Sequence, residues 1–309
     1  MVETRKIGGE GGLDVSLVGL GCNAFGKRVD EKGTHAVIDA ALEAGITFLD
    51  TAETYGGGLS ETFIGTALKG RRDKVVLTTK FGHSKSFVEG KSKGSPENIR
   101  FAVEQSLKNL QTDYLDLYQQ HRPDTETPVG DTMGALNDLV EEGKIRYFGC
   151  SAYTGGQMQE AVDVAKAAGY QGFVTAQNPW NMLMRGIEDD LIPVCDANGI
   201  GLLPYYPLAK GLLTGKYTKG AEAPAGSRME GDSDLADADF GLLERLSNYA
   251  KDHGYDLLTL AISWLAVQPS MACVISGASK PEQLASNVAA AGWKLTPAQL
   301  DEVDAILKE

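Results

Sequence analysis

One stretch of the chain decides the fold: Phe48-Leu49-Asp50-Thr51-Ala52-Glu53-Thr54-Tyr55-Gly56. An apolar run that begins at Ile46 predicts a buried strand, and this strand ends on an acid. A glycine-rich turn follows, and Ser60-Glu61 begins a helical pattern. An acid at the end of a rigid strand, with a tyrosine five residues later in the loop, suits catalysis. An Asp that caps the turn and a Tyr that fills a rim would give the same pattern, so the rest of the chain must decide.

Strand and helix patterns alternate on both sides of this stretch. A small hairpin comes first, in which residues 6–8 and 13–15 flank a Gly-Glu-Gly-Gly turn. Strands are then predicted at residues 16–21, 47–50, 74–80, 114–121, 145–151, 173–177, 200–205 and 271–276. Helices are predicted at residues 34–44, 60–68, 96–110, 136–142, 157–168, 186–197, 239–252, 257–267, 281–290 and 297–307.

Eight strands, each followed by a helix, predict a parallel sheet that closes into a (β/α)8 TIM barrel. We expect a single domain over residues 1–309, with an N-terminal β-hairpin cap and extra C-terminal helices. Residues 218–238, rich in Gly, Ala, Pro and Asp, predict a mobile loop. A doubly wound open sheet is the alternative. It should show Gly-x-Gly-x-x-Gly after the first strand, and residues 19–24 lack the third glycine.

The composition excludes several classes of function. A formal net charge of −13 argues against a nucleic-acid binder and disfavours anionic membranes. The four cysteines are far apart without a CxxC pair, so neither a metal site nor a disulfide framework is expected. The first residues lack the apolar core of a signal peptide, and no apolar run reaches membrane-spanning length. We therefore expect a cytoplasmic protein.

Titratable residues stand at the ends of three consecutive predicted strands. Asp50 ends the second strand and Tyr55 lies in its loop, while Lys80 and His121 end the third and fourth. The carboxyl ends of barrel strands meet at one mouth, so these four side chains are expected to converge. A structural ion pair and a rim histidine would explain each residue alone, but not all four together.

The chemistry of the four residues fits together. The ammonium group of Lys80 should lower the pKa of Tyr55, and Asp50 can keep Lys80 in place and charged. His121 can orient the substrate oxygen or share the proton. Tyr55 is then a candidate general acid near neutral pH, which protonates a carbonyl oxygen as hydride arrives at carbon.

Several longer segments together resemble the aldo-keto reductase family over nearly the whole chain. The sequences of these segments resemble the branch of the family near potassium-channel β subunits and bacterial sugar or general aldehyde reductases. The matching segments are residues 19–21, 49–56, 79–80, 113–124, 143–146, 149–151, 177–178, 207–216 and 277–284.

The resemblance implies NADPH-dependent reduction of an aldehyde or ketone, and the reverse oxidation of an alcohol. Tyr55 matches the proton donor of the family, and Asp50, Lys80 and His121 complete its tetrad. The potassium-channel β subunits tend to lack a histidine at the position of His121. The presence of His121 therefore favours a catalytically active enzyme. Tyr55, His121 and Trp180, which follows the sixth strand, are the candidate substrate contacts.

The resemblance also implies that NADP(H) lies extended across the barrel mouth. Ser151 and Gln177 match positions that hold the nicotinamide carboxamide, and Tyr205 matches an aromatic residue that stacks on the nicotinamide ring. The pyrophosphate loop and the long loop over it match Tyr206, Pro207, Leu208, Lys210, Gly211, Lys216 and Arg228. The adenine and 2′-phosphate site matches Ser279, Lys280, Gln283 and Asn287. The remaining expected cofactor contacts are Cys22, Asn23, Asp50 and Gly277.

Three positions depart from the family pattern. Tyr206 stands where relatives usually have Ser, Ala152 where many have Asn or Arg, and Ser286 where some place an adenine-binding acid. Lys280 beside Ser279 favours NADP over NAD, since an extra dianion needs a cation. These departures bear on cofactor affinity rather than on the type of reaction.

Two other functions compete with a carbonyl reductase. One is a regulatory subunit that senses NADPH with little turnover. The other is a barrel hydrolase that uses Asp50 and a second carboxylate, for which no strand-end acid has comparable support. The natural substrate, a small-molecule carbonyl compound, is left open among small aldehydes, methylglyoxal, sugars and pyridoxal. The direction of the reaction and the oligomeric state are open as well.

Overall fold

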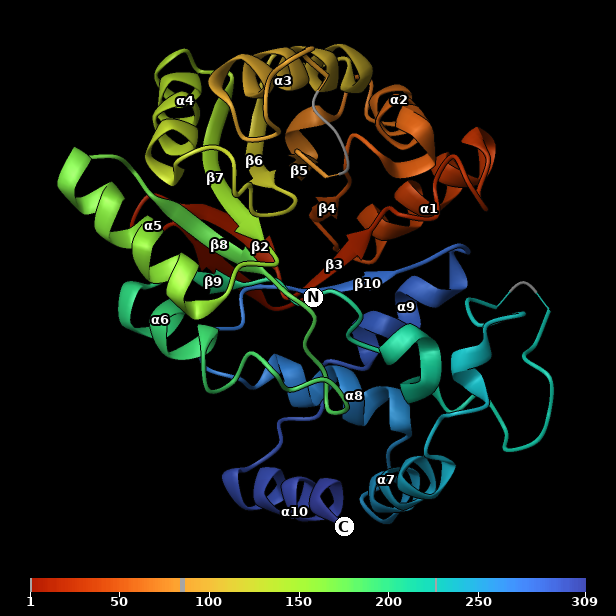
Figure 1. The fold of residues 1–309 in the computed structure, drawn as a ribbon. Coiled ribbons are helices and arrows are strands. Elements are labelled where there is room, and N and C mark those ends of the chain that lie inside the picture. The colour runs from red at the N-terminus through yellow and green to blue at the C-terminus, as the bar shows by residue number, and fades with distance from the viewer. Residues whose placement is uncertain (1, 84–86, 226) are drawn as a thin grey trace.

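The computed structural model describes all residues except 1, 84–86 and 226. Its centre is a sheet of parallel strands in the order β10-β3-β4-β5-β6-β7-β8-β9 (Figure 1). A parallel bridge between Leu202 and Met271 joins the two edges, so the strands form the predicted (β/α)8 barrel. The strands are β3 (Val18–Gly21), β4 (Phe48–Asp50), β5 (Val76–Phe81), β6 (Leu115–Gln120), β7 (Ile145–Ser151), β8 (Phe173–Gln177), β9 (Gly201–Leu202) and β10 (Val274–Gly277).

Helices surround the barrel, and several helices of the chain begin at side-chain caps. Ser95 accepts a hydrogen bond from the amide of Asn98 and is followed by a proline, and Thr154 and Thr296 each form a capping box. The surrounding helices are α1 (Glu31–Glu43), α2 (Leu59–Ala67), α3 (Pro96–Leu110), α4 (Val129–Glu141), α5 (Gly155–Ala168), α6 (Leu191–Asn198), α8 (Leu257–Ala266) and α9 (Glu282–Ala289).

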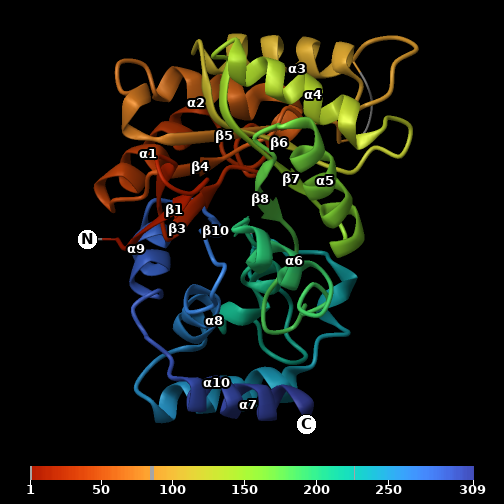
Figure 2. The ribbon, with the colours of Figure 1, turned by 90° about the vertical axis from the view of Figure 1, so that its left-hand side faces the viewer.

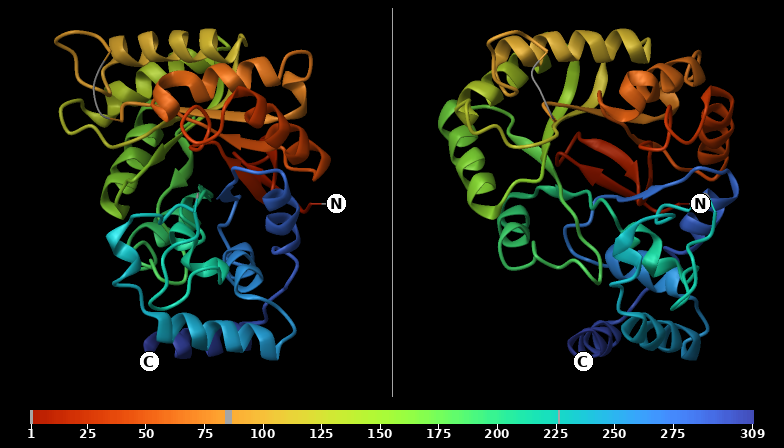
Figure 3. Two further views of the ribbon diagram at one scale, coloured as in Figure 1. Left: turned by 90° about the vertical axis from the view of Figure 1, so that its right-hand side faces the viewer. Right: turned by 45° about the vertical axis from the view of Figure 1, so that its right-hand side comes forward.

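The two additions predicted from the sequence are both present. The hairpin of β1 (Thr4–Ile7) and β2 (Leu13–Ser16) packs Ile7 and Val15 against the apolar interior of the barrel. Ser16 hydrogen-bonds the backbone of Thr47, just before β4, so the hairpin covers the amino ends of the strands. The extra helices α7 (Phe240–Asp252) and α10 (Pro297–Lys308) lie side by side as an outer layer (Figures 2 and 3).

Several predicted elements were wrong in their extent, and prolines explain two of them. The helix predicted at 186–197 begins only at Leu191, because Pro193 is tolerated in a first turn but not in a helix interior. The strand predicted at 200–205 is only Gly201–Leu202, since Pro204 cannot donate to a ladder. The strand predicted at 271–276 starts at Val274.

The core has two parts that meet at the strands. One cluster fills the space between the strands and the helices and includes Trp264, which is 2% exposed. The other fills the barrel interior above the hairpin. Within the described part of the chain, no helix combines the length and apolar character of a membrane span.

Candidate active site

A cavity of about 930 Å³ opens at the carboxyl ends of the strands. Its wall includes Gly21 of β3, Asp50 of β4, Ser151 of β7, Gln177 of β8 and Gly277 of β10. The loops after β4, β6 and β9 complete it. In a parallel barrel this end collects residues from every strand, and active sites of such barrels lie there.

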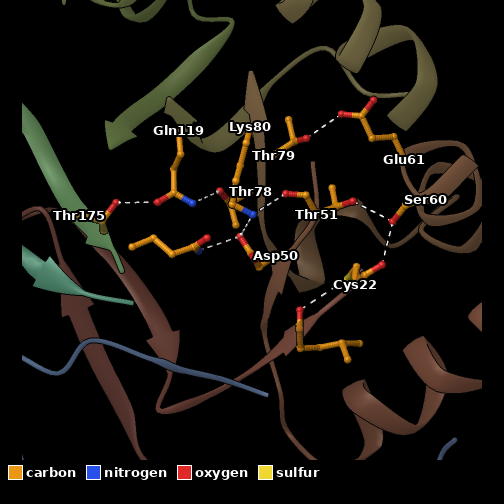
Figure 4. A network of polar contacts seen from close by, with 12 residues as sticks. Cys22, Asp50, Thr51, Ser60, Glu61, Thr78, Thr79, Lys80, Gln119 and Thr175 are labelled. Carbon is orange, nitrogen blue, oxygen red and sulfur yellow. Dashed lines mark hydrogen bonds and ion pairs between the residues drawn. The ribbon is translucent and has the colours of Figure 1, made fainter. Parts of the chain in front are cut away.

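A buried ion pair lies at the floor of this cavity, where Asp50 lines the cavity and Lys80 lies beneath it. The Lys80 ammonium nitrogen Nζ lies 2.7 Å from Oδ1 of Asp50 and 2.8 Å from the carbonyl oxygen of Thr51 (Figure 4). Gln177 donates a second hydrogen bond to Oδ1 of Asp50, at 3.1 Å. Lys80 is fully buried and Asp50 nearly so. Removing one partner of such a pair would leave a buried, uncompensated charge.

The lysine of this pair stays charged. Burial alone would lower the pKa of Lys80, but the neighbouring Asp50 and Tyr55 raise it above its ordinary value. An ammonium group is therefore held beneath the cavity across the physiological pH range.

Tyr55 lies in the 3₁₀ turn Tyr55–Gly58 that follows β4. Gly56 has a φ of +58°, and a Cβ there would lie 2.6 Å from the carbonyl oxygen of Phe25. The glycine thus lets the turn pack closely on the loop after β3. The Tyr55 ring centroid lies 5.2 Å from Nζ of Lys80.

The predicted direction of the Tyr55 pKa was wrong. Burial raises this pKa by more than the charge of Lys80 lowers it, so the net shift is upward. Tyr55 therefore remains a neutral phenol that carries its proton at neutral pH. It can still act as a general acid, with the lysine stabilising the phenolate that donation leaves behind.

His121 follows β6 and faces the same space. Its ring meets the Tyr55 ring edge to face, with centroids 6.0 Å apart, and lies 4.6 Å from the ring of His83. Burial, aided by the charge of Lys80, lowers the pKa of His121 to about 2. The imidazole is neutral, and its buried Nδ1 has no hydrogen-bond partner in the described part of the chain.

A polar network behind the floor was not predicted from the sequence. Glu61 of α2 is only 1% exposed, and it accepts a hydrogen bond from Thr79 of β5 at 2.7 Å (Figure 4). It accepts a second hydrogen bond from Asn109, at 3.1 Å. Ser60 hydrogen-bonds Thr51 and the carbonyl oxygen of Cys22. These contacts tie the first turn of α2 to the strands that carry Asp50 and Lys80.

The cavity wall gathers nearly all of the residues predicted for catalysis and for binding of cofactor and substrate. Two of the predicted residues do not line it. Lys80 lies beneath the floor, and Trp180 is 2% exposed, packs against Trp264 and donates to Glu188 at 2.9 Å. Those on the wall are Cys22, Asn23, Asp50, Tyr55, His121, Ser151, Gln177, Tyr205, Tyr206, Pro207, Leu208, Lys210, Gly211, Lys216, Arg228, Gly277, Ser279, Lys280, Gln283 and Asn287.

Basic side chains concentrate on the β9–β10 side of the wall. Lys216, Arg228 and Lys280 have no ion pair with any described residue, whereas Lys210 bonds Asp232 and Asp234. The guanidinium of Arg228 lies 4.5 Å from the centroid of the Tyr206 ring.

Two further features of the wall are the hydrogen bonds at the start of α9 and the positions of the three residues that depart from the family pattern. Oε1 of Gln283 accepts the amides of Ser279 and Lys280, at 2.8 and 3.1 Å. Of the three departures, Tyr206 and Ser286 line the cavity, and Ala152 and Tyr206 both have positive φ.

Four charged or titratable wall residues were missed in the sequence: Arg28, His83, Arg122 and Glu282. Arg28 follows β3 and His83 follows β5, where no family motif marked them. Arg122 directly follows His121. The argument that residues at strand ends meet at the mouth, which predicted His121, could therefore have predicted Arg122 as well. Thr54, Thr214, Leu258, Ile275 and Ala278 also line the cavity.

Comparisons with known proteins agree with this architecture. The chain is 35% identical over 313 residues to "Probable aldo-keto reductase 1" of Glycine max, covering 98% of this chain and 88% of that protein. It is 34% identical over 316 residues to "Probable voltage-gated potassium channel subunit beta" of Oryza sativa subsp. japonica, covering 97% and 95%. The solved structure of aldo-keto reductase AKR11C1 from Bacillus halodurans, in its holo form, superposes with a TM-score of 0.83 at 31% identity, covering 99% and 96%.

The family assignment rests on nearly the full length of the chain. The model of the Aldo/keto reductase family matches residues 17–308, from just before β3 to the end of α10. The resemblance in the sequence motifs is thereby confirmed, together with its branch, since both a reductase and a channel β subunit are among the relatives. The chain belongs to the aldo/keto reductase family.

Proposed function

We propose that the protein reduces an aldehyde or ketone to an alcohol with NADPH, and catalyses the reverse oxidation, with Tyr55 as the proton donor. The observation that carries the proposal is the floor of the cavity. A neutral phenol stands there beside a buried, charged lysine and a neutral histidine. This set can donate a proton to an oxygen and stabilise the anion that donation leaves.

The residues of the wall fit a phosphate-rich dinucleotide. Lys216, Arg228 and Lys280 supply cations, and Ser279, Gln283 and Asn287 supply polar groups beside them. Ser151 and Gln177 offer a hydroxyl and an amide near the floor. When bound, NADPH supplies the hydride for the reaction. A protein of formal net charge −13 repels anions overall, so this local cluster favours such a ligand.

The chain's own residues then have distinct roles. Tyr55 gives its phenolic proton to the carbonyl oxygen. Lys80 stabilises the resulting phenolate, and Asp50 holds Lys80 charged and in place. His121 is neutral, so it can donate one hydrogen bond to the same oxygen without placing a second full charge beside Lys80. Burial of Lys80 and Asp50 keeps water away from their ion pair and strengthens the interaction.

A regulatory subunit that binds NADPH and turns over little is the second candidate. The 34% identical rice relative described as a probable potassium channel β subunit favours it. The intact set of Tyr55, Lys80, Asp50 and His121 favours an enzyme instead. We also infer a cytoplasmic location, which the four free and buried thiols support.

The test follows the absorbance of reduced nicotinamide with 4-nitrobenzaldehyde as substrate. Wild type and Tyr55→Phe are each assayed with NADPH and with NADH. Turnover that prefers NADPH and collapses in Tyr55→Phe is the expected result. If both proteins bind NADPH but neither reduces any aldehyde or ketone of a broad panel, the reductase proposal fails and the regulatory subunit takes its place.

A further inference from the structure

Arg122 is the one exposed arginine that directly adjoins a catalytic candidate. It follows His121 after β6 and lines the cavity. It has no ion pair or hydrogen bond with any other described residue. Most arginines of the described chain that lie outside the cavity do have carboxylate partners, as Arg72 has in Asp116 and Arg185 in Asp304. The guanidinium at the mouth therefore keeps its five donors free.

The position of Arg122 separates it from the cations proposed for NADPH. In the strand order, β6 is four strands from β10, so the two stand on opposite sides of an eight-stranded barrel (Figure 1). Lys280 follows β10, and Lys210, Lys216 and Arg228 follow β9, which the Leu202–Met271 bridge joins to β10. Arg122 is thus a second positive site, next to the floor and away from the first.

Among the described residues, no carboxylate forms an ion pair with Arg122. The only acids on the described wall are Asp50, which is engaged by Lys80 and Gln177, and Glu282, which lies beyond β10. The charge of Arg122 contributes to the lowered pKa of both His83 and His121, and it acts on Tyr205 across the mouth. This side of the mouth is therefore positive, with neutral imidazoles next to the guanidinium.

We propose that Arg122 forms an oxyanion subsite, and that the preferred substrates are carbonyl compounds that also carry a carboxylate or phosphate group. The inference rests on the proposed reductase function and adds its substrate class. The planar guanidinium can hold a carboxylate or phosphate through two parallel hydrogen bonds. Arg122 and His121 are adjacent in the chain, so the carbonyl oxygen would face Tyr55 and His121 while the anionic end is held by Arg122.

The experiment compares matched substrates that differ in charge. One pair is 4-formylbenzoate and its neutral methyl ester, and the other is glyceraldehyde 3-phosphate and glyceraldehyde. The value of kcat/KM is measured with NADPH for wild type, Arg122→Gln and Arg122→Lys. Lys280→Gln serves as the matched control, because it removes a cation from the opposite side of the same cavity.

Wild type is expected to prefer the charged member of at least one pair, and the two pairs show whether carboxylate or phosphate fits. Arg122→Gln should lower kcat/KM for that charged aldehyde roughly 10- to 100-fold, mostly through KM, and leave its neutral partner unchanged. Arg122→Lys should recover part of the loss. Lys280→Gln should leave the ratio of charged to neutral substrates as in wild type.

Equal preference within both pairs for wild type would overturn the subsite, as would an equal loss for charged and neutral aldehydes in Arg122→Gln. Calorimetric titration with 4-formylbenzoate and with glyceraldehyde 3-phosphate separates this failure from that of the proposed function. Binding that depends on Arg122, without turnover of any of the four aldehydes, would uphold the subsite and refute the reductase. Neither binding nor turnover would refute both.

Discussion

The floor and the rim of the cavity differ in how their charges are paired. The floor is the region around Asp50 and Lys80, and the rim is the β9–β10 side of the wall, which carries the basic side chains. On the floor, Lys80 and Asp50 are buried and paired with each other, and further hydrogen bonds join them to Thr51 and Gln177. On the rim, Lys216, Lys280 and Arg228 have no ion pair with the described residues. The charges of the floor are paired before any ligand arrives, whereas these three cations of the rim have no ion-pair partner among the described residues.

This difference assigns the two regions to different parts of the function. Preorganised groups in a dry environment act on the charge that develops during a reaction. Exposed cations act on affinity, and solvent and salt screen them. Changes to the floor should therefore alter turnover and stability, and changes to the rim should alter binding.

The largest effect is expected for Lys80→Met. This change leaves the Asp50 carboxylate buried without its cation, so the free energy of unfolding should fall by about 3–5 kcal/mol. Turnover should fall by at least about 100-fold as well, because Tyr55 loses the group that stabilises its phenolate. Urea unfolding and steady-state kinetics measure both. The double variant Asp50→Asn with Lys80→Met should regain much of the stability but none of the turnover; unchanged stability of Lys80→Met would contradict the account.

The loop that joins β4 to Tyr55 should respond to pH through Glu53. Burial raises the pKa of Glu53 to about 7, while Oε1 accepts the amide of Gly82 and Oε2 is buried without a partner in the described chain. A carboxyl whose pKa is raised by folding contributes stability that is present below its unfolded pKa and is lost as pH rises through its folded pKa.

Between about pH 5 and about pH 8, wild type should therefore lose up to roughly 3 kcal/mol of stability relative to Glu53→Gln. The amide variant keeps the shape and the acceptor for Gly82 but does not titrate. Denaturant unfolding of both proteins across this range measures the difference. Parallel pH profiles for the two would show that Glu53 does not titrate there.

On the rim, Lys280→Ala should weaken NADPH without weakening NADH. The proposed partner of Lys280 is the 2′-phosphate, which only NADPH carries, so KM for NADPH should rise about tenfold at unchanged kcat. Steady-state kinetics with each cofactor measure the change. An equal rise in KM for NADH would mean that Lys280 contacts a part of the cofactor that NADH and NADPH share.

The smallest effect concerns Lys210, the rim cation that is already paired. It bonds Asp232 and Asp234 in the long loop, at 3.1 and 2.5 Å. Replacing both acids by Asn should free the ammonium for the cofactor and lower KM for NADPH about two- to threefold. The gain should vanish at high salt because these groups are exposed. A rise in KM would mean that the pairs instead hold the loop in its binding position.

Much of the fold and the floor could be predicted from the sequence, because each depends on local pattern. The alternation of strands and helices predicted the barrel, and the titratable strand ends predicted that Asp50, Lys80 and His121 converge. Pro193 and Pro204 were visible in the sequence, yet the helix and the strand that contain them were predicted to be longer than they are.

What could not be predicted depends on tertiary packing. Glu61 begins a helix with an ordinary polar pattern, and only its contact with Thr79 makes it a buried part of the site. The pKa of Tyr55 was expected to fall, because the sequence names the neighbouring lysine but not the extent of burial. The cofactor positions came from family resemblance rather than from any local pattern.

The separation of floor and rim is tested most directly by single turnover of pre-bound NADPH, with nicotinamide fluorescence reporting both binding and oxidation. Tyr55→Phe should bind NADPH as wild type does but oxidise it at least about 100-fold more slowly. Lys280→Ala should bind it about tenfold more weakly yet oxidise it at the wild-type rate once saturated. Oxidation at the wild-type rate in Tyr55→Phe, or slowed oxidation in saturated Lys280→Ala, would contradict the account.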